Sequence, residues 1–457
     1  MTSLAGMSPT GSEKAVAEHN NIAGGDPINA AEQGLVATDQ YGRALVEIDA
    51  KAESRLRRKI NLHVLPPMAF MYLFCFIDRA NIGNAKLAGL EKDLELHGHD
   101  YNAVLSIFYI SYILFEIPST VACKLIGPGW FLPAITVLFG VCSVCTGFVD
   151  NIHAASGVRF LLGIFEAGMM PGIAYYLSRW YRGRELAFYL SIYVVTAPLA
   201  GAFGGLLASA ILTLDHFGTL HTWRMIFAIE GLITIGLGLL SFIILTDRPE
   251  TARWLSQTEK DLAITRLKSE RVGTTEVLDQ LDKPKMLRGI LSPVTLCTAV
   301  IFLLNNITVS GLAFFAPTIV KSIYPDTTVV AQQLHTVPHH VPTHPLRRDL
   351  FHLQRHIHLW CALQRPPIGT NVMFGNIGGL ISTWSFLPSD APDYHIGNGL
   401  NLATSAMTFL LAAAMWMWMR WDNHRREAVD VERVLEGFSQ SEVQDLDWLN
   451  PGFKWRT

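Results

Sequence analysis

The stretch Arg159–Gly172, which reads RFLLGIFEAGMMPG, decides the fold of this chain. It lies in an apolar run long enough to cross a membrane, yet it carries Arg159 and Glu166. A charged side chain at mid-helix costs about 2.5–3.5 kcal/mol on insertion scales, so such residues usually face a protein-lined, wet cavity. Two helical turns separate the two residues, so we expect both on one helix face, as an anion ligand and a protonatable group. A purely structural polar network is the alternative.

Small residues inside the apolar runs predict tight helix contacts. Gly163, Ala167 and Gly168 form a smooth flank in the same stretch, which suits close packing against a neighbouring membrane helix. Cys142 and Cys145 form a C-x-x-C, but they lie inside an apolar run without further metal-ligand partners. We interpret them as packing residues rather than as a redox or metal site.

Composition places the chain in a membrane. Half of the 457 residues are hydrophobic, 16% are charged and the net charge is −3. A soluble protein carries about a quarter charged residues, and a near-neutral charge gives no reason to expect a nucleic-acid partner. The apolar residues form runs that can span roughly 30 Å of hydrocarbon. We therefore expect an all-α, multi-pass protein whose first partner is the lipid bilayer.

Nine apolar runs predict membrane spans. They are Ile60–Ile77, Tyr101–Ile117, Phe131–Phe148, Ala155–Leu177, Leu186–Leu212, Trp223–Leu245, Leu296–Ile323, Val372–Phe386 and Leu400–Met419. The eighth is short and rich in glycine. Six spans, a basic central loop and a second helical set are typical of a carrier built from two pseudo-symmetric bundles.

Basic residues predict the orientation. Lysines and arginines cluster before the first span, after the fourth span and in the central loop, so the positive-inside rule places these segments in the cytoplasm. The expected organisation is a disordered cytoplasmic tail (1–59), a six-helix bundle (60–245), a cytoplasmic loop (246–292), a C-terminal bundle (293–420) and a second cytoplasmic tail (421–457).

The segment 332–370 interrupts the C-terminal bundle. Of the 32 residues His335–Pro366, 22 are His, Pro, Leu, Arg or Gln, the five amino acids whose codons begin with C. We interpret the segment as read in a shifted frame or through a mis-spliced junction, with a genuine polar insertion as the alternative. Its clustered histidines are interpreted as part of this bias rather than as a metal site. The C-terminal bundle is therefore expected to be incomplete.

Further charged residues lie at the ends of other spans. The first span ends in FIDRANIGNAK (Phe76–Lys86), which puts Asp78 and Arg79 at its expected outer rim and Asn81 beyond. An Asp-Arg pair at a helix end also suits side chains that reach to the membrane interface. Spacing alone leaves both readings open.

The second and sixth spans each carry a glutamate. Glu116 lies two residues before Pro118, which frees backbone carbonyls, so Glu116 is either a structural carboxylate that caps a neighbouring helix or a ligand. Glu230 is interpreted as a hydrogen-bonding group between helices, with proton coupling as the weaker alternative. Arg224 is interpreted as an anchor at the membrane interface.

These motifs resemble one family. YLFCFIDRANIGNA, FEIPS, RFLLGIFEAGMMPG, WRMIFAIEG and DRPETARWL are similar to segments of the allantoate permease group of fungal anion:cation symporters, in the major facilitator superfamily. The likeness continues through FGNIGG, DAPDYH, WDNHRRE and NPGFKWR, and covers residues 50–331 and 371–456.

The resemblance implies twelve spans and proton-coupled uptake of small carboxylates such as nicotinate, allantoate, pantothenate, biotin or tartrate-like acids. It implies anion binding and proton linkage by Arg79, Arg159 and Glu166. With the other charged and polar residues of the spans, we predict substrate binding by Arg79, Asn81 and Arg159, and proton coupling by Glu166, Asp78 and Glu116. No cofactor or metal is expected, and the carrier is expected to be a monomer in the plasma membrane.

The chain departs from the family pattern in two places. The loop KLIGPGW (Lys124–Trp130) has fewer acids and bases than the superfamily uses to latch its inward gate, and the eighth to tenth spans are missing. A transport-inactive product is therefore the second hypothesis, and a membrane nutrient sensor the third. No motif for a nucleophile or a nucleotide-binding loop is present, so we do not expect an enzyme.

Overall fold

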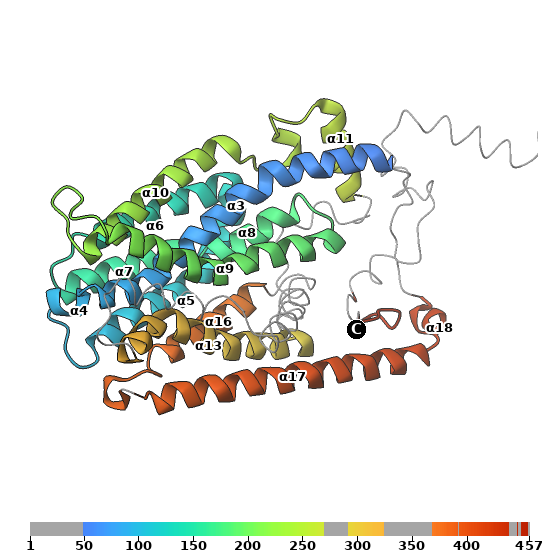
Figure 1. The fold of residues 1–457 in the computed structure, drawn as a ribbon. Coiled ribbons are helices and arrows are strands. Elements are labelled where there is room, and N and C mark those ends of the chain that lie inside the picture. Colours follow the sequence, from blue (N-terminus) through green and yellow to red (C-terminus); the bar gives the residue numbers. More distant parts are fainter. Residues whose placement is uncertain are drawn as a thin grey trace, which may run out of the picture.

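The computed structural model describes residues 49–268, 291–323, 368–391, 393–437, 446 and 449–455, which form helices and loops. The helices are α3 (Ala50–Leu87), α4 (Leu90–Asp93), α5 (Asp100–Ile126), α6 (Pro128–Thr146), α7 (Ile152–Glu166), α8 (Met169–Ser178), α9 (Gly183–Ile211), α10 (Trp223–Ile244), η2 (Pro249–Thr251), α11 (Gln257–Lys268), α13 (Pro293–Ile323), α16 (Ile368–Ser382), η3 (Pro388–Asp390), α17 (His395–Glu427) and α18 (Val431–Leu435) (Figure 1). The all-α membrane fold predicted from the sequence is confirmed.

Seven spans in the described ranges are long and apolar enough to cross a membrane, with α7 and α8 together forming one of them. All nine predicted runs fall on helices, but two helices do not meet this criterion. Within α9 the described residues give Leu199–Ile211 as a shorter apolar helix, although the sequence of α9 is apolar from Leu186 onward, and α16 has 15 residues. At 1.5 Å per residue α16 is about 22 Å long, short of the roughly 30 Å of a bilayer core.

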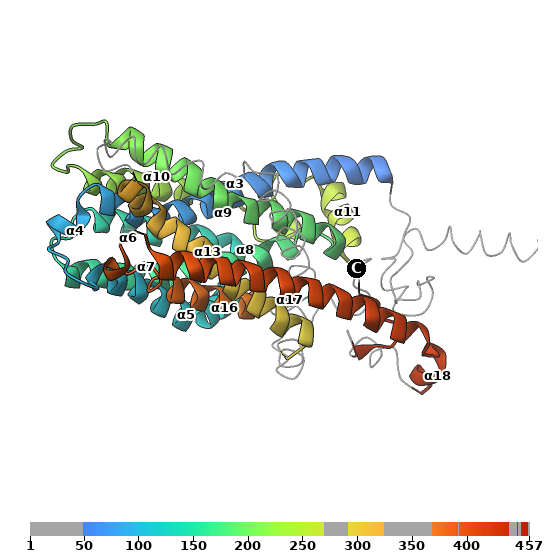
Figure 2. The same cartoon turned by 60° about the horizontal axis from the view of Figure 1, so that its bottom comes forward.

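The first membrane helix extends further than the sequence predicts, in both directions. It begins at Ala50, where Asp49 accepts a hydrogen bond from the Lys51 backbone N–H, and its first turns project beyond the bundle beside α11 (Figures 1 and 2). Residues 50–59, expected in the disordered tail, are therefore helical. At the other end α3 continues to Leu87, so Asp78 lies within the helix rather than at its outer rim.

The helices lie side by side along one direction (Figures 1 and 2). In the N-terminal half α5 packs on α7, α6 packs on α10 and α7, and α3 packs on α9 and α10. In the C-terminal half α13 packs on α16 and α17. The two halves meet where α13 contacts α3 and where α16 contacts α5 and α8. Most of segment 332–370 lies outside the described residues; its last three residues begin α16.

A C-terminal clip closes the expected cytoplasmic end of α17. Trp455 Nε1 donates to Asp422 Oδ2 at 2.6 Å, and the Trp455 backbone N–H donates to Asn423 Oδ1 at 2.7 Å. Arg426 donates to the carbonyl of Asn450 at 2.9 Å. The Trp455 ring is buried in an apolar cluster with Val294 of α13, so the clip joins the start of α13 to the end of α17.

The small residues of the fourth span permit close helix contact, as the sequence predicts. A methyl group built on Gly163 would overlap the Ser111 hydroxyl and the Phe108 carbonyl of α5. One built on Gly168 would lie 2.7 Å from the Phe131 ring of α6. These two glycines therefore let α7 and the start of α8 lie directly against both neighbours.

We expect Gly163→Ala to destabilise the protein by about 1–3 kcal/mol, because the added methyl overpacks the α5–α7 contact. Thermal unfolding in detergent, followed by fluorescence-detected size exclusion, measures the loss. Gly157→Ala is the matched control: it lies on the same helix, and an added methyl meets no atom within 4 Å. The control is expected to be neutral or slightly stabilising, since alanine favours a helix over glycine by about 1 kcal/mol. Equal melting temperatures for the two variants would contradict the contact.

Candidate functional site

An ion pair joins the first and fourth spans at the centre of the N-terminal half. Arg79 Nε of α3 donates to Glu166 Oε2, the last residue of α7, at 2.5 Å. The Glu166 side chain is 0% exposed. The Cys75 thiol, one turn before Arg79 on α3, donates to the same oxygen at 3.4 Å. Two residues that the sequence assigned to separate roles, substrate binding and proton coupling, therefore share one contact.

Aromatic rings surround the Arg79 guanidinium. Its central carbon lies 5.0 Å from the Phe76 ring, 5.4 Å from the Phe108 ring and 4.9 Å from the Tyr112 ring. Cation–π contacts of this kind hold a desolvated guanidinium in place without neutralising its charge. Glu166 is thus the group that balances the charge of Arg79, while the rings fix its position.

Arg159 lies on the same helix as Glu166 but is not paired with it. Arg159 is 4% exposed, and its Nη2 has no hydrogen-bond partner among the described residues. Its guanidinium carbon lies 5.5 Å above the Phe227 ring of α10. Arg159 and Glu166 are both buried, and it is Arg79 of α3 that pairs with Glu166. No ion pair of Arg159 occurs in the described part of the chain.

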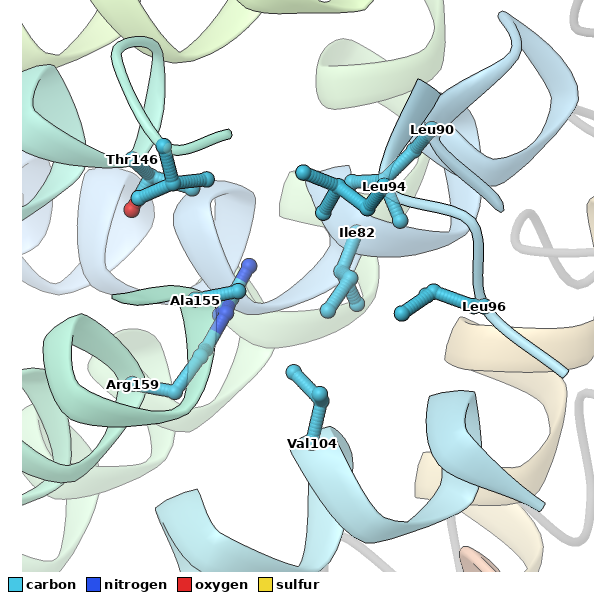
Figure 3. A pocket seen from close by; sticks show the side chains of 9 residues that line it. Ile82, Leu90, Leu94, Leu96, Val104, Thr146, Ala155 and Arg159 are labelled. Atoms are coloured by element: carbon cyan, nitrogen blue, oxygen red, sulfur yellow. The ribbon is translucent and has the colours of Figure 1, made fainter. Parts of the chain in front are cut away.

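Arg159 also lines a small cavity (Figure 3). The cavity has a volume of about 10 Å³, room for roughly one water molecule. The residues that line this cavity include Leu90, Leu94 and Leu96, from the segment that follows α3, and Thr146 of α6. Arg159 is therefore a buried cation with one unused donor next to a small, mostly apolar space.

Asp78 and Asn81 face away from this cavity and towards α6 and α10. Asp78 Oδ1 accepts from the Ser143 hydroxyl at 2.7 Å. The Asn81 amide donates to Glu230 Oε2. Glu230 therefore has the interhelix hydrogen bond that the sequence predicts, whereas Asn81, predicted to bind substrate, is engaged inside the bundle. Electrostatic attraction also links Asp78 to Arg159.

Glu116 lies apart, where the two halves of the protein meet. It is 1% exposed, and neither carboxylate oxygen reaches hydrogen-bond geometry with a described group. The side chain of Asn376 on α16 is its polar neighbour from the other half. Glu116 does not cap a neighbouring helix in the described ranges, so the capping interpretation is not supported.

The sequence did not single out Tyr109, Tyr112 or Cys75, although all three belong to the site. The Tyr109 hydroxyl donates to Ser310 of α13 at 3.1 Å, which connects the site to the C-terminal half. The available signal was periodicity: Tyr109, Tyr112 and Glu116 recur at helical spacing on α5 and so share one face.

Contacts between the halves close the expected outer end of the site. Asn102 Nδ2 donates to the Thr383 carbonyl at 2.5 Å, and the hydroxyls of Ser106 and Thr383 lie 3.0 Å apart. Trp384 Nε1 donates to the Ser106 hydroxyl at 2.9 Å. This region consists of side-chain contacts between helices, which can separate without unfolding either half.

At the expected cytoplasmic end, Asp247 joins the loop Lys124–Trp130 to the end of α8. Asp247, just after α10, pairs with Arg179, the residue after α8, at 3.0 Å. Asp247 also accepts a hydrogen bond from the Gly129 backbone N–H at 3.2 Å. A side chain on Gly129 would collide with the Asp247 backbone, so the glycine permits this close approach.

Helix α11 is held to the same end by ion pairs. Arg266 is 1% exposed and pairs with Glu53 of α3 at 3.0 Å and with Glu185 of α9. Lys59 Nζ lies 2.7 Å from Glu259 Oε2, and its hydrogen bond, with that from Ser256, holds the pKa of Glu259 below its ordinary value. Helix α11 is therefore docked on the N-terminal half.

Comparison with known proteins gives the family. The model of the Major Facilitator Superfamily matches residues 68–425. The chain belongs to the major facilitator superfamily. An uncharacterized transporter of Schizosaccharomyces pombe is 28% identical over 94% of this chain and 94% of its own length. A protein of Agrobacterium vitis whose name assigns it to tartrate transport is 30% identical over 60% of this chain and 62% of its own.

A solved structure shares the major facilitator fold. The proton:xylose symporter XylE, bound to 6-bromo-6-deoxy-D-glucose, superposes with a TM-score of 0.58 at 12% identity, over 79% of this chain and 96% of XylE. At this identity the likeness concerns the fold. Together with the named relatives it makes this chain a multi-pass secondary transporter of the alternating-access type. The narrower allantoate permease group, which the sequence resembles, is not settled by these matches.

Proposed function

We propose that this major facilitator protein is a proton-coupled carrier of small organic carboxylates. The observation that carries the proposal is Arg159: a buried guanidinium with an unused donor beside a small apolar space. A planar guanidinium matches a carboxylate in a two-point contact, which makes it suited to an anion rather than to a neutral sugar. The relative named for tartrate transport supports the same class of substrate.

Coupling follows from the contact between Arg79 and Glu166. While Glu166 is ionised, it occupies the Arg79 guanidinium. A proton taken up by Glu166 removes that charge and frees Arg79 to attract a carboxylate, so substrate and proton load together. Loss of the proton on the inner side restores the ion pair and expels the anion. Each step exchanges one counter-charge for another, which keeps the buried guanidinium neutralised.

Asp78 supports this exchange from the other side of α3. Its electrostatic attraction reaches both Arg159 and Arg79, while the Ser143 hydroxyl holds it in place. In the proposal Asp78 positions the two cations, and Asn81 stabilises the α3–α10 contact through Glu230 rather than touching the substrate. The protein acts as a monomer in the plasma membrane, without a cofactor.

Uptake into proteoliposomes tests the function. The purified chain is expected to accumulate a radiolabelled monocarboxylate or dicarboxylate when the outside is at pH 5 and the inside at pH 7.5, and to stop when an ionophore collapses the gradient. A panel of nicotinate, tartrate and pantothenate, with xylose as the neutral control, separates anions from sugars. Gradient-driven uptake of xylose alone would contradict the proposal. No uptake of any compound by folded protein would favour a transport-inactive product.

A further inference from the structure

Glu116 is a buried carboxyl whose polar neighbour from the other half is the uncharged side chain of Asn376. It lies on α5, ten residues before the helix end at Ile126, about 15 Å from the expected cytoplasmic end. Neither of its oxygens has hydrogen-bond geometry with a described group, although the residue is 1% exposed. A buried ionised carboxylate requires a counter-charge or donors, so the closed arrangement suits the protonated acid.

The surroundings of Glu116 provide little to stabilise a negative charge. Among the described residues, the charged or titratable groups that act on Glu116 electrostatically are Arg79 of α3 and Tyr112 of its own helix. Arg79 is already bound to Glu166 at 2.5 Å. From the other half, α16 offers the uncharged Asn376. An ionised Glu116 would therefore lack a dedicated counter-ion as long as α16 covers it.

The cover over Glu116 comes from the partner half. Helix α16 packs on α5 and on α8, the cytoplasmic part of the fourth span. One turn further along α16, Gly379 lies so close to the Tyr109 ring that an added methyl would overlap it. A movement of α16 away from α5 is thus what would expose Glu116 to water.

We propose that Glu116 is a proton-linked gate residue: its carboxyl stays protonated while α16 and α5 are in contact, and loses its proton when the inner side opens. This inference rests on the proposed alternating-access carrier, but it assigns Glu116 to the opening of the inner gate and not to the substrate. A neutral cytoplasm then favours the inward-open state, and an acidic exterior favours its closure.

Cys75 offers a reporter of this opening. Its thiol is buried at the site, beside Glu166, and becomes accessible when one side of the carrier opens. In a chain with the other five cysteines replaced by serine, inside-out vesicles are treated with an impermeant methanethiosulfonate at pH 6, 7 and 8. The rate of Cys75 labelling is compared between the parent and Glu116→Gln, so that the intrinsic pH dependence of the thiol cancels.

The parent-to-Gln ratio of labelling rates is expected to rise by about tenfold from pH 6 to pH 8. A single titrating proton can change an equilibrium by at most about tenfold per pH unit, so this rise lies within the limit of about 100-fold over the two units. A ratio that stays constant would overturn the proposal. Glu116→Asp keeps a titrating group and is expected to retain the increase in Cys75 labelling rate with pH. Should the Gln variant fail to fold, a labelling rate of the Asp variant that does not change with pH would also overturn the proposal.

Glu230→Gln is the matched control, because Glu230 is a buried carboxyl whose hydrogen bond connects α3 and α10 inside one half. It is expected to keep the parental pH dependence, and a flattened profile there would assign the effect to any buried acid and defeat the proposal. The measurement needs no substrate. If the parent-to-Gln ratio of labelling rates rises with pH but no carboxylate is taken up, the proposed substrate class is wrong and the gate role stands. If carboxylate is taken up but the ratio stays constant with pH, the gate role is wrong and the proposed substrate class stands.

Discussion

Arg159→Ala is expected to reduce carboxylate uptake at least 30-fold while the protein still reaches the membrane. Removing one partner of a buried, hydrogen-bonded charge pair costs about 2–5 kcal/mol, and here the lost partner would be the one that faces the bound anion. Because Arg159 forms no ion pair among the described residues, its removal breaks no described salt bridge. Asp78 loses the attraction of Arg159 but keeps the hydrogen bond from the Ser143 hydroxyl. Initial uptake rates in proteoliposomes, normalised to the amount of folded carrier, measure the effect.

Two variants show whether the loss belongs to the site. Arg159→Lys is expected to recover only part of the uptake, since an ammonium cannot reproduce the two-point contact of a guanidinium. Arg224→Ala is the control, because Arg224 pairs with Asp150, whose side chain is 82% exposed, at the expected outer rim. We expect its uptake to stay within about twofold of the parent, as an exposed ion pair contributes about 0–1 kcal/mol. Normal uptake by Arg159→Ala would reduce Arg159 to a structural role.

Glu166→Gln is expected to abolish accumulation against a gradient while substrate exchange continues. Glutamine keeps the size of glutamate but cannot lose a proton, so the Arg79 guanidinium is left permanently available to the substrate. The ratio of internal to external substrate should fall to about 1 at every pH between about 4.5 and 7.5. Counterflow in preloaded vesicles should remain, because exchange of one anion for another needs no proton.

The same substitution at Glu230 is the control for this prediction. Glu230 accepts from Asn81 and lies inside the α3–α10 contact, where the glutamine oxygen can accept the same hydrogen bond. Glu230→Gln is expected to accumulate substrate with the parental pH profile. If Glu166→Gln still concentrates substrate, proton coupling moves to another carboxyl, with Asp78 next in line. A structural role for Glu166 predicts low expression with unchanged coupling.

The sequence predicts the helices well and their limits less well. All nine predicted apolar runs fall on helices of the described residues. The reason is that unpaired backbone groups are costly in lipid, so a segment that crosses the membrane forms a helix in which these groups pair. The first helix was ended too early, at Ile77, because a charged pair follows there. The structure buries Asp78 and pairs Arg79 with Glu166 of another helix, so the helix continues through both charges rather than ending before them. Hydropathy measures a residue alone, whereas burial depends on its neighbours.

The site was predicted as a set of residues but not as a set of pairs. Helical periodicity correctly places Arg159 and Glu166 inside the protein, because a membrane helix turns its charges away from lipid. It could not show that Arg79 approaches Glu166, or that Asn81 turns to Glu230, because these contacts join helices distant in sequence. The aromatic rings around Arg79 were missed for the same reason: in an apolar span, a tyrosine or phenylalanine looks like ordinary packing.

The C-terminal clip has an evolutionary consequence. WDNHRRE and NPGFKWR are separate motifs in the sequence, but Trp455, Asp422 and Asn423 make them two halves of one contact. Selection then acts on the pair, and a change at Asp422 should be tolerated only in lineages that also change Trp455. Chains that have lost one motif are expected to have lost the other. We therefore expect the motifs WDNHRRE and NPGFKWR to be inherited together.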